Sequence, residues 1–351
     1  MANTSSPQHR DSHRSLTRRS FGVLALGSFS ALALAACGSS NSSDSNASAS
    51  SASTSAKPAP SALPSGMGSA AGDGEFPRTV KHFRGETKIE SAPKNVVILS
   101  TGQLDDVLAL GLVPIGAATA NDADLVPEYL KTKFSDKSAE LDKIAKVGKR
   151  TEPRLGAIAN LHPDLILINN TNKKEEVYSS LSKIAPTVVT EGTGHNWKQD
   201  FLMVASALGS LSKAEEMLKD YEDKAKKLGE KAGKEKTFSF LYAAGDRTRV
   251  YAKPSFVGSI CEDASLTHPA VQQEGKTSID LSSENLDQAD GDYLFYGVQG
   301  SDESKLTSET LWESLKAVKE KHAHKVDSDM FYLNAGITAA LGVIEEIDKH
   351  I

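Results

Sequence analysis

The stretch PKNVVILSTGQLDDVLALGLVPIGAA, residues 93–118, decides the fold. Within it, residues 95–100 form a short β-branched run after a proline, which predicts a buried strand. A helical stretch, GQLDDVLALGL, comes next, and residues 113–118 predict a second strand. A strand, a helix and a strand of these lengths indicate a parallel sheet with helices on its faces.

The same alternation continues on both sides of a long charged segment. Before that segment we predict helices over 153–161 and 174–184 and strands over 164–170 and 187–190; after it we predict strands over 237–244, 248–252 and 292–297. The sequence therefore predicts the α/β fold class with two Rossmann-like α/β lobes, residues 81–208 and 236–351.

The charged segment itself predicts one long helix, residues 209–235, which joins the two lobes as a single spine. Its apolar residues recur at three- and four-residue spacing and so mark one buried stripe. They are Leu211, Ala214, Leu218, Tyr221, Ala225 and Leu228. Over Lys213 to Lys231 the helix would run about 30 Å at its usual rise.

The N-terminal residues 1–36 have the layout of a secretory signal. Basic residues, among them the pair Arg18 and Arg19, precede an uncharged apolar run that is short for a transmembrane helix. The arginine pair favours twin-arginine export over the general route. Leu34-Ala35-Ala36-Cys37 resembles the bacterial lipobox, which implies lipid on Cys37 and a place on the extracytoplasmic face of the cell membrane.

Residues 37–80 are assigned to a flexible tether behind the lipidated cysteine. The stretch from Gly38 to about Gly74 is rich in Ser and Ala and has almost no large apolar side chain. Such a segment buries too little surface to offset its ordering entropy, so we expect disorder there.

Composition narrows the remaining possibilities. The chain has 351 residues, a formal net charge of −6 and 39% hydrophobic residues, which is typical of a soluble globular protein. Because no basic patch dominates, nucleic acid is not expected as a partner. Cys261 is the only cysteine besides Cys37, so we expect a small buried side chain and no disulfide framework. We also expect a monomer.

Four blocks of sequence resemble the class III substrate-binding lipoproteins of ABC importers, the ferric-siderophore and cobalamin class. They are residues 93–118, 147–169 (VGKRTEPRLGAIANLHPDLILIN), 282–297 (SSENLDQADGDYLFYG) and 311–327 (LWESLKAVKEKHAHKVD). The second block is closest to the ferric-hydroxamate branch. The resemblance implies a metal chelate bound between two lobes, delivery to a membrane permease, no catalysis and no cofactor.

The resemblance also implies which residue contacts the ligand. Arg150, in GKRTEP, matches the arginine that contacts ligand oxygens in the hydroxamate-binding relatives. A guanidinium suits that role because its planar fork stays charged and addresses two oxygens at once. The alternative is a surface arginine paired with Glu152. Asn172 stands where those relatives carry a ligand-contacting tyrosine, so the particular siderophore stays open.

Further ligand-binding candidates lie in both lobes, and the permease candidates are acidic. The ligand candidates are Arg247, Arg249 and Tyr251 around one strand, and the aromatic residues Trp197, Tyr296, Trp312 and Tyr332. For permease docking the family uses a carboxylate on each lobe. Glu175 or Glu176 matches the first, and Glu262 replaces the second because the matching position is Ser259.

Two other function classes stay open beside haem or cobalamin binding. Direct metal capture would use the histidines, but His162, His195, His268, His322 and His324 show no recognised zinc spacing. An exported hydrolase would need a nucleophile, and no G-x-S-x-G elbow is present.

Overall fold

The computed structural model describes residues 58–120, 124–273, 275–300 and 302–351. The predicted signal sequence and Cys37 lie outside these residues. Every described residue belongs to one compact unit, which lies within Ala52–Ile351. No helix of the described part is long and apolar enough to cross a membrane.

The N-terminal lobe is built on a six-stranded sheet with the order β6-β5-β4-β3-β7-β8. Its strands are β3 (Val96–Ile98), β4 (Gly116–Thr119), β5 (Ala145–Lys149), β6 (Glu152–Pro153), β7 (Leu165–Asn169) and β8 (Thr187–Thr190). All neighbours run parallel except β5 and β6. Every residue of β7 is buried, as expected for a strand covered on both faces.

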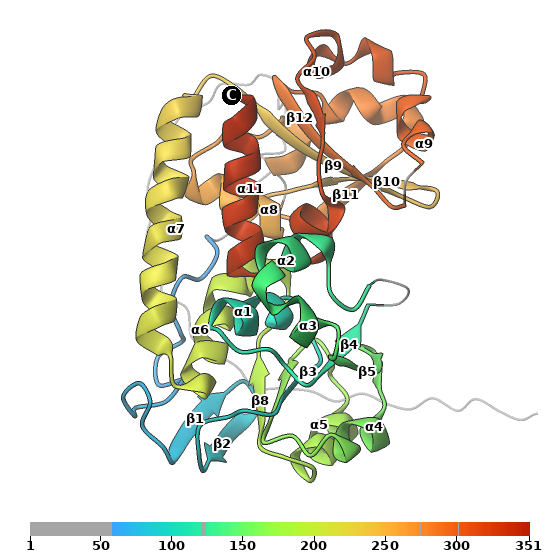
Figure 1. The fold of residues 1–351 in the computed structure, drawn as a ribbon. Helices are drawn as coiled ribbons and strands as arrows, with labels where there is room; N and C mark the ends of the chain where they lie inside the picture. Colours follow the sequence, from blue (N-terminus) through green and yellow to red (C-terminus); the bar gives the residue numbers. More distant parts are fainter. Residues whose placement is uncertain (1–57, 121–123, 274, 301) are drawn as a thin grey trace, which may run out of the picture. The chain divides into compact units, whose positions relative to one another are not determined.

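Helices cover both faces of this sheet (Figure 1). They are α1 (Gln103–Ala109), α2 (Glu128–Lys133), α3 (Ser138–Leu141), α4 (Leu155–Asn160), α5 (Glu175–Ser182) and α6 (Trp197–Leu208), with short 3-10 turns at Ser135–Lys137 and Gly194–Asn196. Apolar side chains of α1 and α6 pack on one face and those of α4 and α5 on the other. The loops at the carboxyl ends of the strands are thereby held on a rigid layer.

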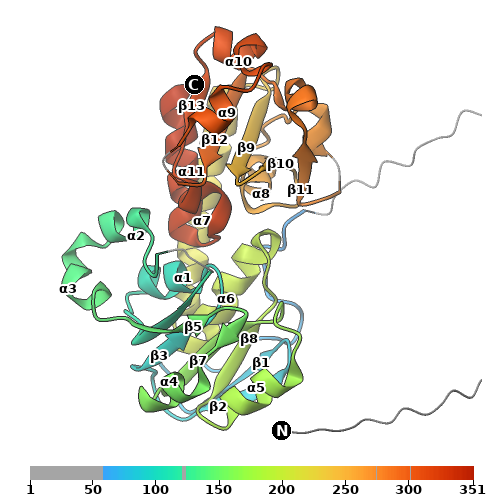
Figure 2. The same cartoon turned by 90° about the vertical axis from the view of Figure 1, so that its right-hand side faces the viewer.

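The C-terminal lobe has a five-stranded sheet with the order β11-β10-β9-β12-β13. The strands are β9 (Phe238–Ala244), β10 (Arg247–Tyr251), β11 (Ser278–Leu281), β12 (Tyr293–Val298) and β13 (Ala323–Lys325). β9, β12 and β13 are parallel, and β10 and β11 complete an antiparallel edge. Figure 2 shows this sheet in the upper lobe and the sheet of the N-terminal lobe below it.

One face of this second sheet packs against long helices and the other against short ones. The helical elements are α8 (Phe256–Asp263), α9 (Ser304–Thr307), α10 (Lys316–Lys319), α11 (Ile337–His350), the 3-10 segments Ala270–Gln273, Ser283–Ala289 and Trp312–Ser314, and the π-helical turn η6 (Asp329–Leu333). α8 and α11 share a core with Phe238, Phe240 and Tyr242 of β9. Two α/β lobes confirm the expected fold class.

The predicted spine is present as α7, Leu211–Ala232. Five residues of the predicted stripe are buried, Ala214, Leu218, Tyr221, Ala225 and Leu228, as is Ala232, while Leu211 is half-buried. α7 packs against α6, α8 and α11, and Figure 1 shows it running beside α11. Burial of this stripe, rather than helix propensity alone, stabilises so long a helix.

The tether boundary predicted at residue 80 is wrong for residues 58–80, which are ordered. This segment leads into strand β1 (Arg78–His82), which pairs with β2 (Gly85–Ile89). Arg78 is buried and donates to the backbone oxygens of Glu75, Gly72 and Ser206 at 2.5–3.0 Å. Asp73 accepts from the backbone N–H groups of Leu211 and Ser212 at 2.8 and 2.9 Å, so it caps α7. The composition of the segment did not predict this order, because polar contacts of this kind need no large apolar side chain.

The two lobes meet where the first turn of α1 contacts the first turn of α11. The Asp105 carboxylate accepts from the backbone N–H groups of Thr338 and Ala339 at 2.8 and 2.9 Å, and from the Tyr129 hydroxyl at 3.1 Å. Gly102 has φ +83°, and a Cβ there would lie 2.1 Å from the Ala335 carbonyl oxygen. A glycine is thus required for this close approach.

Candidate functional site

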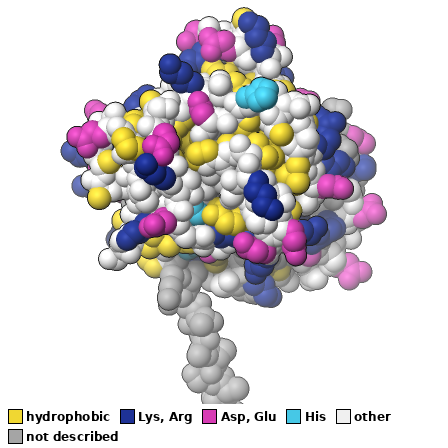
Figure 3. Space-filling view, turned by 90° about the horizontal axis from the view of Figure 1, so that it is seen from below, with side chains coloured by type: hydrophobic (Ala, Val, Ile, Leu, Met, Phe, Trp, Pro, Cys, Tyr) yellow, Lys and Arg dark blue, Asp and Glu magenta, His cyan; other side chains and the backbone are white. Residues whose placement is uncertain are grey.

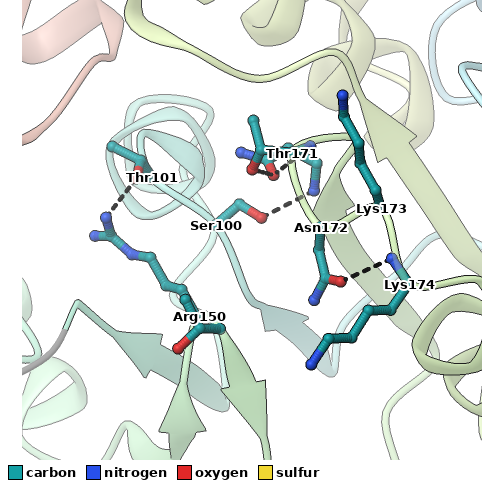
Figure 4. A pocket seen from close by; sticks show the side chains of 9 residues that line it. Ser100, Thr101, Arg150, Thr171, Asn172, Lys173 and Lys174 are labelled. Atoms are coloured by element: carbon teal, nitrogen blue, oxygen red, sulfur yellow. Dashed lines mark hydrogen bonds between the residues drawn. The ribbon is translucent and has the colours of Figure 1, made fainter.

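A hollow of about 440 Å³ opens at the carboxyl ends of β3 and β7 (Figure 4). Ligand sites of α/β sheets commonly lie at this edge. We call it the basic hollow, and it is lined by Ser100, Thr101, Arg150, Thr151, Asn169, Thr171, Asn172, Lys173 and Lys174. Three of these side chains are cationic, the others carry hydroxyl or amide groups, and none is a carboxylate or an aromatic ring. Such a lining suits the anionic or partly charged oxygens of a chelate.

Arg150 is positioned by the turn between β5 and β6. Its backbone N–H donates to the Thr119 carbonyl oxygen at 2.9 Å, and its Nη1 donates to the Thr101 hydroxyl. The guanidinium therefore bonds across the hollow instead of pairing with Glu152 (Figure 4). Its Nε is buried and makes no hydrogen bond. A buried donor without a partner costs free energy, which an arriving acceptor would recover.

A second hollow, of about 280 Å³, lies where the lobes face each other. Arg150, Thr119 and Asp124 line it from the N-terminal lobe, and Asp329 and Tyr332 line it from η6. Burial raises the pKa of Asp329, and the nearby Arg150 opposes that rise. Burial lowers the pKa of Arg150, and Asp329 opposes that in turn. Arg150 lines both hollows, so the two form one cleft around its side chain.

Three tyrosines of the C-terminal lobe pack together beside this second hollow. Tyr242 and Tyr332 stack with ring centroids 5.3 Å apart, and Tyr251 lies 5.0 Å from Tyr332. The Tyr332 hydroxyl donates to the Phe295 carbonyl oxygen at 2.8 Å, so this ring is fixed. Of the aromatic candidates, Tyr332 lines the cleft and Tyr251 supports it.

Arg249 joins this tyrosine group, whereas Arg247 does not. The Arg249 guanidinium carbon lies 6.0 Å from the centroid of the Tyr242 ring, and its buried Nε has no hydrogen-bond partner. Arg247 instead binds Asp280 of β11 with 2.8–3.1 Å hydrogen bonds, and its side chain is 61% exposed. The expectation that Arg247 faces the ligand disagrees with this edge-strand ion pair.

Trp197 lies in the core and lines neither hollow, although it borders a smaller adjoining cavity of about 170 Å³. It is 1% exposed, and its ring makes edge contacts with Tyr221 and Phe256. Its indole N–H donates to the Ser259 hydroxyl at 3.2 Å. The ring therefore ties α6 to α7 and α8.

Trp312 and Tyr296 also lie away from the cleft, contrary to the prediction that they form its walls. Their rings pack edge to face at 5.0 Å in the core on the outer face of the second sheet. The Tyr296 hydroxyl donates to Glu303 at 2.6 Å, which leaves it no role toward the cleft. Strand alternation explains the difference, because Tyr296 pairs with Leu241 and so lies on the face opposite Tyr242.

The acidic candidates for permease docking lie on helices of different lobes. Glu175 and Glu176 are exposed in the first turn of α5, and Glu175 lies 3.4 Å from Arg84. On α8, Ser259 is buried, while the Glu262 side chain is 40% exposed and pairs with Lys253 at 3.1 Å. On the face seen in Figure 3, acidic and basic side chains are interspersed, so the described residues there form no extended patch of one charge.

Sequence reasoning missed Lys173, Lys174 and Tyr242. The two lysines follow β7 at the strand edge where ligands bind, and that position was the available signal. Tyr242 could have been found from the hairpin, because the short Gly245–Asp246 connection pairs Arg249 with Tyr242. In the described ranges, no three His, Cys, Asp or Glu side chains are grouped to hold a metal ion.

The family profile described as periplasmic binding protein matches residues 96–330. The chain belongs to this family. One relative of this binding protein is a Bacillus subtilis protein named as a probable siderophore-binding lipoprotein, YfiY. It is 33% identical over 291 residues, which cover 78% of this chain and 87% of the relative. The iron(3+)-hydroxamate-binding protein FhuD of the same organism is 29% identical, covering 74% of this chain and 82% of FhuD.

Among solved structures, this binding protein resembles Staphylococcus aureus SirA in complex with staphyloferrin B. The TM-score is 0.67 and the identity 28%, over 78% of this chain and 97% of SirA. This likeness confirms the two-lobed α/β fold, and the family membership confirms the resemblance to substrate-binding proteins that was based on four sequence blocks.

Proposed function

We propose that the protein is an extracytoplasmic receptor that binds an iron(III)–siderophore complex in the cleft and delivers it to an ABC importer, without catalysis. The observation that carries the proposal is the basic hollow, in which Arg150, Lys173 and Lys174 face a space without any lining carboxylate. Relatives named for siderophore and iron(3+)-hydroxamate binding support the choice of ligand.

A hydroxamate complex is the favoured ligand. Its six oxygens share the charge of three deprotonated groups, and guanidinium and ammonium donors can bond them without competing for the iron. The fixed Tyr332 ring supplies an apolar surface on the opposite side of the cleft. Burial of ligand surface against that ring would add to the binding free energy.

A ferric α-hydroxycarboxylate complex of the citrate type is the second candidate. Three cations in the basic hollow suit a complex with net negative charge better than a neutral one. The similar SirA structure contains staphyloferrin B, and another Bacillus subtilis relative is named as an Fe(3+)-citrate-binding protein.

Calorimetric titration of the purified protein separates these ligands. The panel is ferric hydroxamate, ferric catecholate, ferric citrate, haem and cobalamin. Saturable submicromolar binding of ferric hydroxamate supports the favoured ligand, and the same result with ferric citrate supports the second. Binding of haem or cobalamin with no response to any iron chelate would refute both.

Membrane attachment through lipid on Cys37, monomeric state and permease docking are part of the proposal. Glu175, Glu176 and Glu262 are accessible on the two lobes and suit pairing with basic groups of a transporter. A Cys37→Ala variant should appear in the medium instead of the membrane fraction. Intact-mass measurement of the wild-type protein should show added acyl chains.

A further inference from the structure

A small polar cavity of about 170 Å³ adjoins the basic hollow. Thr101, Asn169 and Thr171 line both spaces, so a molecule in the hollow can extend into the cavity. The chemistry of the cavity differs from that of the hollow. Two carboxyl groups, those of Asp106 and Asp200, line it, and no basic side chain does.

Two buried polar atoms of this cavity have no hydrogen-bond partner. They are Oδ1 of Asp106 and Nε2 of Gln103, and both residues are 2% exposed. Gln103 already uses its carbonyl oxygen, which accepts from the backbone N–H groups of Leu99 and Ser100 at 3.3 and 3.0 Å. Buried polar groups are normally paired, so these atoms indicate an occupant with polar groups.

Neither carboxyl group forms an ion pair with a described cation, and Asp200 accepts from the backbone N–H groups of Glu191 and Gly192 at 2.9 and 2.7 Å. Asp105, the adjacent acid, is saturated by α11 and Tyr129. Arg150 bonds Thr101 on the side of the hollow, and Lys198 pairs with Asp263 at 2.6 Å. Burial raises the pKa of Asp106 well above its ordinary value and that of Asp200 to about 7. Buried carboxyl groups in this state need either a proton or a cation.

We propose that this cavity is a subsite for a primary ammonium group, held by Asp106 and Asp200 beside Gln103. Its volume corresponds to about five or six water molecules, so a methylammonium-sized end fits together with water that accepts from Gln103. A chelated divalent metal ion fits less well, because the described residues offer no third acidic or imidazole group there. The ammonium group either belongs to an amine-bearing arm of the chelate, which rests on the proposed function, or is a free primary ammonium ion.

Thermal unfolding of the protein without chelate tests the subsite. At equal ionic strength, methylammonium chloride should raise the wild-type Tm by about 2 °C more than potassium or tetramethylammonium chloride. Asp106→Asn should abolish this difference, and Asp200→Asn should reduce it. Asp124→Asn, a carboxyl of the cleft outside the cavity, is the matched control and should retain it. Each variant is compared with itself across salts, so a change in basal stability does not affect the result.

The proposal is overturned if methylammonium is no better than potassium in the wild type, or if its advantage survives in Asp106→Asn. A second titration identifies the source of the group. A linear ferric trihydroxamate ending in a primary amine is compared with its N-acetyl derivative. About tenfold tighter binding of the amine, lost in Asp106→Asn, assigns the subsite to the chelate, and equal affinity assigns it to a free cation. Failure of both complexes to bind would count against the hydroxamate function and leave the methylammonium result as the test of the subsite.

Discussion

Arg150 is the residue on which ligand affinity should depend most. Its side chain lines both hollows, and its buried Nε has no hydrogen-bond acceptor. Arg150→Ala should weaken binding of the ferric complex by about 1.5–3 kcal/mol, the range for hydrogen bonds to charged groups. Titration calorimetry of the variant measures this loss.

Arg247→Ala is the matched control, because that guanidinium binds Asp280 at the exposed sheet edge. It should leave affinity unchanged. Equal losses in both variants would mean that general positive charge, and not the placement of Arg150, holds the ligand.

Asp292 should make the stability of the fold depend on pH. Its carboxylate accepts from the backbone N–H and hydroxyl of Thr237 and from Lys316 at 2.6–2.9 Å, and the bond from Lys316 is the main cause that lowers its pKa to about 2. A lowered carboxyl pKa stabilises the fold above the unfolded value, near 3.8, and this contribution is lost as the pH falls toward 2. Urea unfolding should therefore show a stability gap between wild type and Asp292→Asn that narrows over this interval. A gap that stays constant down to pH 2 would contradict the role of the ionised carboxylate.

At the scale of elements, the cap on α7 links the segment before the first lobe to the spine. Asp73→Ala removes the acceptor for the N–H groups of Leu211 and Ser212 and should cost about 1 kcal/mol of unfolding free energy. Glu216→Ala, at an exposed position of the same helix, should cost nothing measurable. Chemical denaturation of both variants tests this, and equal stability of the two would exclude the cap.

The sequence was sufficient to predict the elements that depend on apolar periodicity. The β7 run and the stripe on α7 have one physical solution each, burial on a sheet and burial along a helix. The positions of Trp197 and Trp312 could not be predicted from the sequence, because an aromatic side chain at the start of a helical segment packs equally well into a core or against a ligand. The role of Lys173 and Lys174 in lining the hollow becomes apparent only when the ends of separate strands are seen together in three dimensions.

At the scale of the whole molecule, the contact between α1 and α11 should control how the lobes sit together. Gly102→Ala would place a methyl group against the Ala335 carbonyl and also strain a positive φ. Gly74→Ala is the matched control, since its φ is +73° and nothing lies near its Cβ. Each variant should lose about 1–2 kcal/mol from backbone strain. Only Gly102→Ala should in addition change the affinity for the ferric complex, which calorimetry would detect. An affinity change of the same size in Gly74→Ala would exclude the lobe contact as the cause.

The long helix α7 is held at both ends, by Asp73 at its start and by the 2.9 Å pair between Lys231 and Asp348 of α11 near its finish. A helix restrained at both ends bends little. We therefore expect the two lobes of the receptor to be close to their ligand-bound spacing before the ligand arrives. Little conformational entropy is then lost on binding, and selectivity between ligands depends on how well each one fits a preformed site. The transporter would have to recognise a loaded receptor by small shifts at its rim instead of by a wide swing of the halves.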